Sequence, residues 1–154
     1  MPITENYHPA LDLKTLKSAI DTIFPGAVQA KAQNYILNTI IMTGELNTYR
    51  EGLRELNRLT WEIYQLLFAE LALDQRVIVL HRMQDTDFFD ILRQHTMEGV
   101  FADPIYGGND NKIGWKIIGF PGSRFHPVTH LSRGWKAREF VSLADEGRLR
   151  EDER

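Results

Sequence analysis

Residues 49–67, Tyr49-Arg-Glu-Gly-Leu-Arg-Glu-Leu-Asn-Arg-Leu-Thr-Trp-Glu-Ile-Tyr-Gln-Leu-Leu67, decide the fold class. The positions expected to face inward recur at steps of four and three residues, which is the spacing of one face of an α-helix. They are Tyr49, Leu53, Leu56, Thr60, Ile63 and Leu67. Charged residues lie between them: Glu51, Arg54, Glu55 and Arg58. The pattern predicts an amphipathic helix with one face in the core and the other in water.

Two further helices are predicted upstream of this stretch. The first has Pro9 in its first turn and ends at Phe24-Pro25-Gly26, because a proline cannot continue the helix. Its inward positions are Leu13, Leu16, Ile20 and Ile23. The second ends near Gly44, and its inward positions are Val28, Ala32, Tyr35, Ile36 and Ile40.

Two more helices are predicted downstream. Asp74 is expected to cap a short one. Asp85-Thr86-Asp87 supplies a cap and first-turn acids for the other, which must end by Ala102 because Asp103 precedes a proline. The expected inward positions are Val77, Ile78, Leu80 and His81 in the first, and Phe88, Phe89, Leu92, His95, Thr96, Gly99 and Val100 in the second. Since no stretch alternates with a period of two, we predict an all-α fold, a small bundle of about five helices with short connections.

Residues 103–122 differ in character from the predicted helices. Glycine recurs throughout them, yet they carry too many apolar side chains to remain in water. We expect a long, ordered, glycine-rich loop without regular structure of its own. The predicted organisation is an N-terminal arm (1–9), a helical domain that includes this loop (10–122), and a C-terminal extension (123–154) whose charged residues 142–154 form a solvated or disordered tail.

Composition excludes several functions. The 154 residues suit one domain, the net charge is −3, and no dense Lys/Arg stripe is present, so we expect no nucleic-acid partner. The sequence contains no Cys, which excludes disulfides, thiolate metal sites and a Cys nucleophile, and it contains neither a G-x-S-x-G nor a phosphate-loop motif. No apolar run approaches the ~20 residues that a membrane span requires, so no direct membrane insertion is expected. The N-terminus shows no signal-peptide pattern, which predicts a cytoplasmic protein.

His95, Glu98 and Asp103 are the candidate chemical groups. His95 and Glu98 share one helix face, a spacing that suits metal ligands, and Asp103 follows where helix meets loop. The three could also perform acid–base chemistry. We favour a structural interpretation in which Glu98 and Asp103 accept backbone N–H bonds and hold the loop in shape. Two other pairs have ligand-like spacing: Glu5 with His8, and His126 with His130.

The aromatic side chains of the loop allow two interpretations. Tyr106, Trp115 and Phe120 could fold back onto their own helices as a small additional core. They could instead anchor in a partner, because Trp and Tyr are enriched at the centres of interfaces. The surrounding glycines favour the second interpretation modestly, since they allow close approach of the backbone.

Two long motifs in this region resemble a known family. His95-Thr-Met-Glu-Gly-Val-Phe-Ala-Asp-Pro-Ile-Tyr-Gly-Gly-Asn109 and Gly114-Trp-Lys-Ile-Ile-Gly-Phe-Pro-Gly122 resemble the gluconate 2-dehydrogenase subunit 3 family, whose pattern runs approximately H-T-x-E-G-x-[FY]-[SA]-D-P-x-Y-G-G-N, then G-W-x-x-[IL]-G-[FY]-P-G. Weaker similarity extends through 68–75, 87–89 and 16–25, so that it covers about residues 10–122.

The resemblance implies a non-catalytic small subunit of a membrane-associated or soluble dehydrogenase for sugars, aldonates or polyols. Its partner would be a large flavoprotein of the glucose–methanol–choline type that holds FAD, with a cytochrome c as a possible further subunit, and this chain would hold no cofactor or metal. The small subunit would support folding, maturation and stability of the flavin subunit. We expect the partner interface to comprise Tyr106, Gly107, Gly108, Asn109, Trp115, Ile118, Phe120 and Pro121.

The alternative function comes from another class of protein. It is a free-standing small enzyme or metal-binding protein that uses His95, Glu98 and Asp103. The compartment has an alternative as well, because many members of the family begin with a twin-arginine signal and this sequence does not. The protein would be periplasmic if it is exported with its partner or if the sequence is that of a mature form.

Overall fold

The computed structural model describes residues 11–122 and 142–145, and within them the chain is all-α, as predicted. Its α-helices are α1 (Leu13–Ile23), α2 (Ala32–Thr43), α3 (Leu46–Tyr64), α4 (Leu73–Arg82), α5 (Asp87–Phe101) and α6 (Ile113–Ile118). Three short 3₁₀ turns lie between them, η2 (Phe68–Glu70), η3 (Pro104–Tyr106) and η4 (Asp110–Lys112), and a fourth, η5 (Leu143–Asp145), follows later in the chain. No helix among these residues is long and apolar enough to span a bilayer.

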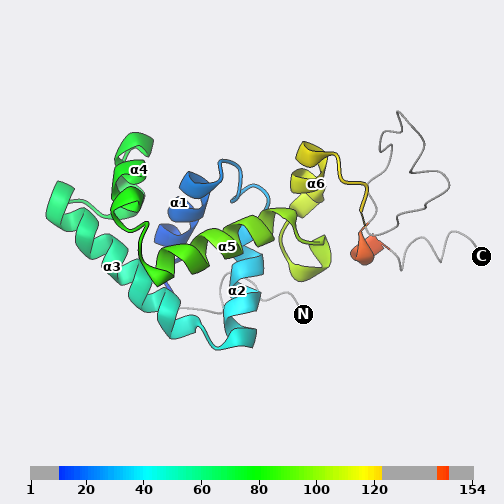
Figure 1. Cartoon of the computed structure of the whole chain (residues 1–154), viewed down its shortest axis with the longest axis horizontal. Coiled ribbons are helices and arrows are strands. Elements are labelled where there is room, and N and C mark those ends of the chain that lie inside the picture. The colour runs from blue at the N-terminus through cyan, green and yellow to red at the C-terminus, as the bar shows by residue number, and fades with distance from the viewer. Residues whose placement is uncertain (1–10, 123–141, 146–154) are drawn as a thin grey trace, which may run out of the picture.

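Helix α5 is the centre of the arrangement. It crosses the middle of the molecule with α1 and α2 beside it, α3 and α4 extend toward one end, and α6 lies at the other end (Figure 1). The largest fully buried side chains come from every long helix, since the apolar face of each must be removed from water. They include Leu16, Ile20, Ile36, Ile40, Tyr49, Leu53, Leu56, Phe68, Leu92 and Val100.

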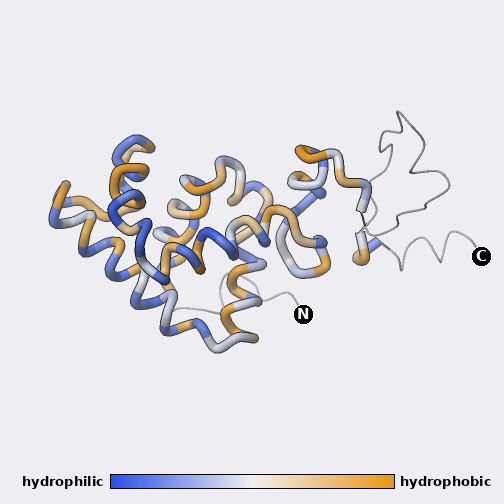
Figure 2. The backbone as a smooth tube through the Cα atoms, viewed as in Figure 1, coloured by the Kyte–Doolittle hydropathy of each residue, from blue (hydrophilic) through white to orange (hydrophobic). Residues whose placement is uncertain are grey.

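Helix α3 confirms the amphipathic pattern but not its limits. Orange and blue residues alternate along its tube in Figure 2, and the charged positions predicted to face water are exposed. The helix begins at Leu46 and ends at Tyr64, because Gln65 adopts a left-handed conformation with φ 55° that reverses the chain. This turn leaves Leu67 48% exposed and buries Phe68 in its place. The inward position predicted for Leu67 is therefore wrong.

Helix α4 corrects a second prediction. Ala72, not Asp74, stands at the cap position, where its N–H donates to the Oε1 atom of Gln75 at 3.0 Å, and Asp74 lies in the first turn. The helix buries Val79 and Leu80. Three of the predicted inward residues are instead exposed: Val77, Ile78 and His81. The error arises because apolar residues 77–80 run consecutively, so that their period does not reveal which side meets the core.

The other helix limits largely agree with the predictions. Helix α1 ends before Pro25, as predicted. Its N-cap is Asp12, whose carboxylate accepts the Thr15 N–H at 3.0 Å. Pro9, predicted in the first turn, lies outside the described residues. Helix α5 ends at Phe101 and is capped by Thr86, as expected. Helix α2 ends before Gly44, which has φ 75°.

The beginning of α2 differs from its prediction. The helix starts at Ala32 rather than near Val28, because residues 25–31 form successive turns. Lys31, just before the helix, has φ 55°, which is a left-handed conformation. Because a right-handed helix cannot pass through such a residue, the preceding turns are separate from α2. Val28 packs against the core from these turns and not from the helix.

Candidate functional site

Residues 103–122 form a folded cap on the C-terminal end of α5. The prediction of a loop without regular structure is wrong, because the segment contains η3, η4 and the short helix α6. The described residues therefore contain six α-helices, one more than the approximately five predicted. Apolar residues that cannot remain in water draw the chain against α5, and its short helical turns satisfy backbone groups that this burial removes from solvent.

Asn109 is the fully buried residue that attaches this cap to α5. Its Nδ2 donates to the Ala102 carbonyl at 2.9 Å, and its Oδ1 accepts the Gly114 N–H at 2.8 Å. Its own backbone N–H donates to the Gly99 carbonyl at 2.7 Å. Asn109 was predicted to contact a partner, and this is wrong, since all its polar atoms bind within the chain. Two of the carbonyl acceptors belong to the end of α5, where helical C=O groups lack partners in their own helix.

Two glycines allow the backbone of the cap to touch α5. A Cβ atom on Gly108 would lie 2.1 Å from the Gly99 carbonyl oxygen, and one on Gly114 would lie 2.0 Å from that of Val100. No other residue type fits at these positions without displacing a backbone atom. Gly108, also predicted to face a partner, is buried by this contact. Its role is internal packing.

Trp115 is a core residue. Its side chain is only 3% exposed, and its indole N–H donates to the Phe101 carbonyl at 2.8 Å. The ring meets Phe120 edge to face, with centroids 5.1 Å apart. The prediction that Trp115 anchors in a partner is therefore wrong. The end of α5 offers the indole a carbonyl acceptor, so that both the apolar ring and its polar atom are satisfied inside the chain.

Asp103 performs the structural role predicted for it. One carboxylate oxygen accepts the Ile105 N–H at 3.0 Å, and the other accepts the Leu143 N–H at 2.9 Å. The first bond begins η3, and the second attaches η5, forty residues further along the chain. Two such bonds to a carboxylate are charge-assisted and correspondingly strong.

The beginning of the predicted C-terminal tail is ordered. Ser142 is buried, and residues 143–145 form η5. The Asp145 carboxylate pairs with Lys112 at 2.6 Å and accepts the Ser142 N–H at 3.0 Å. The Lys112 ammonium first, and the Ser142 N–H second, lower the pKa of Asp145 to about 2. The prediction of a solvated or disordered tail is wrong for 142–145, and 146–154 lie outside the described residues.

Glu98 connects two helices rather than holding backbone N–H groups. Its carboxylate accepts the Tyr35 hydroxyl of α2 at 2.8 Å and the Gln94 amide of α5 at 2.8 Å. Burial, followed by the hydrogen bond to Glu98, raises the pKa of Tyr35. The specific prediction of backbone bonds is wrong.

His95 belongs to a buried polar chain at the α3–α5 contact. Its Nδ1 lies 2.7 Å from the Tyr49 hydroxyl, and its Nε2 lies 3.8 Å from a Glu45 carboxylate oxygen. Burial, reinforced by the nearby carboxylates of Glu45 and Glu98, raises the pKa of Tyr49, so the hydroxyl keeps its proton. The Nδ1 contact has hydrogen-bond length, whereas the Glu45 oxygen lies beyond hydrogen-bond distance of Nε2.

The three candidate chemical groups thus have separate partners. His95 binds Tyr49, Glu98 binds Tyr35, and Asp103 binds backbone N–H groups. Within residues 11–122 and 142–145, no group of three or more His, Asp or Glu side chains could hold a metal ion. The pairs Glu5/His8 and His126/His130 lie outside the described residues.

Several apolar side chains remain on the surface of the cap. Tyr106, Ile118 and Phe120, all predicted interface residues, are 57%, 60% and 43% exposed, and Gly107 and Pro121 are partly buried. Figure 2 shows the outer end of α6 in orange, the colour of hydrophobic residues. Sequence reasoning missed Ile41, Met42 and Ile105, which are exposed as well. The run Ile40-Ile41-Met42 could have indicated exposed apolar residues on α2. Three consecutive residues cannot all lie on the buried face of a helix, so some of them must face outward.

A known family matches most of the chain. The family model described as gluconate 2-dehydrogenase subunit 3 matches residues 10–122, a range that contains all six α-helices of the described chain and the whole cap. No curated protein and no solved structure shows significant similarity to the chain. The match extends over most of the chain and includes both long motifs. The chain belongs to the gluconate 2-dehydrogenase subunit 3 family.

Proposed function

We propose that this chain is the non-catalytic small subunit of an FAD-dependent dehydrogenase for sugars, aldonates or polyols. The large subunit, a flavoprotein of the glucose–methanol–choline type, would hold the FAD and perform the oxidation, and a cytochrome c subunit could receive the electrons. The small subunit would stabilise the flavin subunit during folding and maturation. Membership of the family supports the role of accessory subunit in a dehydrogenase complex.

One observation carries the proposal: the polar groups of the family motifs are used inside the chain. Asn109 and Asp103 hold backbone groups, and Glu98 joins α2 to α5. A catalytic group would need to converge with others on a reacting atom. These side chains instead stabilise one shape of the cap.

The shape so stabilised presents apolar side chains outward. Tyr106, Ile118 and Phe120 project from a backbone that is held against α5. Apolar side chains on a rigid element lose little conformational entropy on association, which favours binding of a partner. This distribution of polar groups inward and apolar groups outward supports an interaction protein over an enzyme.

Co-expression of the flavin subunit with and without this chain tests the proposal. With the chain, we expect more soluble flavin subunit with bound FAD, recognised by its visible absorption, and sugar-dependent reduction of an artificial acceptor. The purified small chain should be colourless and inactive alone. Dye reduction or a bound chromophore in the chain alone would contradict the proposal, as would an unchanged yield of active flavin subunit in its absence.

The Glu98→Gln variant separates the proposed role from the alternative of a free-standing enzyme. Loss of the charged acceptor should weaken the Tyr35 contact and lower the free energy of unfolding by ~1–3 kcal/mol. Turnover per bound flavin in the complex should remain near that of the wild type. A variant that assembles normally and loses turnover by orders of magnitude would instead assign Glu98 to catalysis.

A further inference from the structure

A hollow of about 560 Å³ lies between the C-terminal half of α2 and the η3 turn. Its walls include Ile41 and Met42 from α2, and Ile105 and Tyr106 from η3. These four side chains are between 41% and 87% exposed. We call this hollow the α2–η3 groove. Its lining is mostly apolar, although Asn38, Thr39 and Thr43 also contribute, and the cap described above forms one of its sides.

Two carboxylates stand behind the lining of the α2–η3 groove. The Tyr35 hydroxyl, which lines it, donates to Glu98 at 2.8 Å, and the Thr43 hydroxyl, which also lines it, donates to Glu45 at 2.6 Å. The ion pairs that Lys31, Arg58, Arg93 and Lys112 form within the described residues involve other carboxylates, and Glu45 also lies 3.8 Å from the His95 Nε2 atom. The groove is therefore mostly apolar, with two carboxylates beside it.

The end of α2 adds to this negative charge. The helix ends at Thr43 and has no basic residue in its last turn. The carbonyl groups at the C-terminus of a helix carry a partial negative charge that a cation normally complements. A ligand with a Lys or Arg next to an apolar side chain would satisfy both features of the groove.

We infer that the α2–η3 groove receives a segment of the flavin subunit in which an aliphatic or aromatic side chain is adjacent to a Lys or Arg. The apolar side chain lies between Met42 and Ile105, and the cation lies beside Glu45 and Glu98. This inference rests on the proposed function, because it takes the flavin subunit as the partner. It adds the location of a docking site and the chemistry of the segment that binds there.

Charge complementarity favours this occupant over a second copy of the chain. In a symmetric dimer the same surface of both copies would meet, so that the carboxylates beside one groove would face those beside the other. Each chain also carries a net charge of −3, which opposes self-association. A partner segment with a basic residue removes this repulsion and replaces it with attraction.

Substitution of Ile105 tests the apolar part of the inference. Ile105→Asp introduces a charge into the groove at a side chain that is 53% exposed, so the fold should tolerate it. Ile78→Asp is the matched control, because Ile78 is 47% exposed on α4, outside the lining of the groove. We expect Ile105→Asp to weaken association with the flavin subunit tenfold or more and Ile78→Asp to change it less than about threefold. Equal effects of the two would overturn the inference.

Met42→Asp provides a second variant if Ile105→Asp fails to fold. Met42 is 87% exposed, so its substitution does not disturb the core, and the same tenfold loss is expected. The association constant of the wild-type complex should also fall with added salt, and the slope should flatten in Glu45→Gln. A salt dependence unchanged by Glu45→Gln would contradict the proposed cation.

A photoreactive phenylalanine in place of Met42 identifies the occupant directly. A cross-link to a flavin-subunit segment that contains a Lys or Arg supports the inference. A cross-link to a second copy, or to residues 123–141 of the same chain, overturns it. If the wild-type chain forms no complex with a flavin subunit, the proposed function fails; if the complex forms and every groove variant binds equally, only the groove assignment fails.

Discussion

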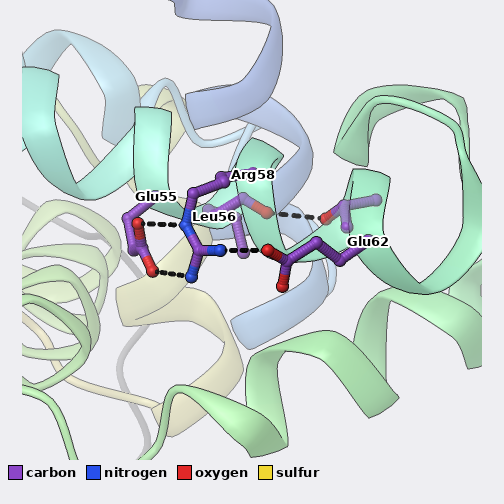
Figure 3. A network of polar contacts seen from close by, with 5 residues as sticks. Glu55, Leu56, Arg58 and Glu62 are labelled. Carbon is purple, nitrogen blue, oxygen red and sulfur yellow. Dashed lines mark hydrogen bonds and ion pairs between the residues drawn. The ribbon is translucent and has the colours of Figure 1, made fainter.

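Helix α3 and the cap of residues 103–122 are stabilised by different kinds of contact. On the exposed face of α3, Arg58 pairs with Glu55 one turn before it and with Glu62 one turn after it, while the opposite face packs into the core (Figure 3). In the cap, Asn109 and Trp115 bind carbonyl groups at the end of another helix. Contacts along α3 join residues three or four positions apart, whereas the Trp115 bond joins residues 14 positions apart.

The difference lies in where each region finds its hydrogen-bond partners. The backbone of a helix bonds to itself, so that α3 requires only an apolar face and water on the other side. The cap consists of short helical segments, and it also depends on the unpaired carbonyl groups at the end of α5. Damage to the cap should therefore cost more stability than damage to the exposed face of α3.

Removal of the indole at Trp115 should have the largest effect. Trp115→Ala leaves a cavity and an unpaired Phe101 carbonyl, and we expect the free energy of unfolding to fall by ~3–5 kcal/mol. Trp61→Ala on α3 is the matched control, because Trp61 is 57% exposed, and its loss should be ~0.5 kcal/mol. Urea unfolding followed by far-UV circular dichroism measures both. Similar losses in the two variants would show that the cap is not anchored by Trp115.

A methyl group at Gly114 should have the next largest effect. Gly114→Ala forces its Cβ against the Val100 carbonyl, and we expect a loss of ~3 kcal/mol, because neither backbone can move without breaking the Asn109 bonds. Gly119→Ala is the control, since nothing lies within 4 Å of its Cβ and only its φ of 71° opposes the substitution. That variant should lose ~1 kcal/mol. Equal melting temperatures for the two alanine variants would contradict the backbone contact.

Acidification should loosen η5. The pKa of Asp145 is lowered from its ordinary 3.8 to about 2, so its contribution to stability is complete above about pH 4 and is lost as the pH falls toward 2. The Ser142 N–H donates to the Asp145 carboxylate, so amide exchange at Ser142, compared with amides inside α3, reports this loss. Asp145→Asn should show fast exchange at Ser142 even at neutral pH. Exchange at Ser142 that is independent of pH, after correction for intrinsic rates, would contradict the contacts of the Asp145 carboxylate.

The smallest effect is expected for the exposed ion pairs of α3. Arg58→Ala removes both carboxylate contacts, yet exposed pairs contribute little because water and salt screen them. The melting temperature should stay within about 2 °C of the wild type. A larger decrease that disappears in high salt would indicate that local ion pairs stabilise α3 more than its packing does.

The motifs in the sequence located the important segment but did not reveal what its residues do. Residues 103–122 were expected to present Gly108, Asn109 and Trp115 to a partner, whereas all three are buried against α5. The glycines and the asparagine were informative as a group, since such residues allow unusual backbone conformations. The glycine-rich backbone could pack against a partner or against its own helix. Which of the two occurs depends on contacts between distant residues, and residue spacing along the chain does not reveal them.

The sequence by itself determined the helical class, the ends of α1, α2 and α5, and most of the inward face of α3. Each of these follows from interactions within one or two turns, which leave a period in the residue pattern. The tertiary structure decided that α4 buries Val79 and Leu80, that Glu98 binds Tyr35, and that the cap closes over the end of α5. It also created the α2–η3 groove, whose walls are about 60 residues apart in the chain. Such features depend on which unpaired carbonyl groups and apolar surfaces come into contact when the helices pack. These contacts join residues far apart in the chain, so they leave no periodic pattern in the sequence.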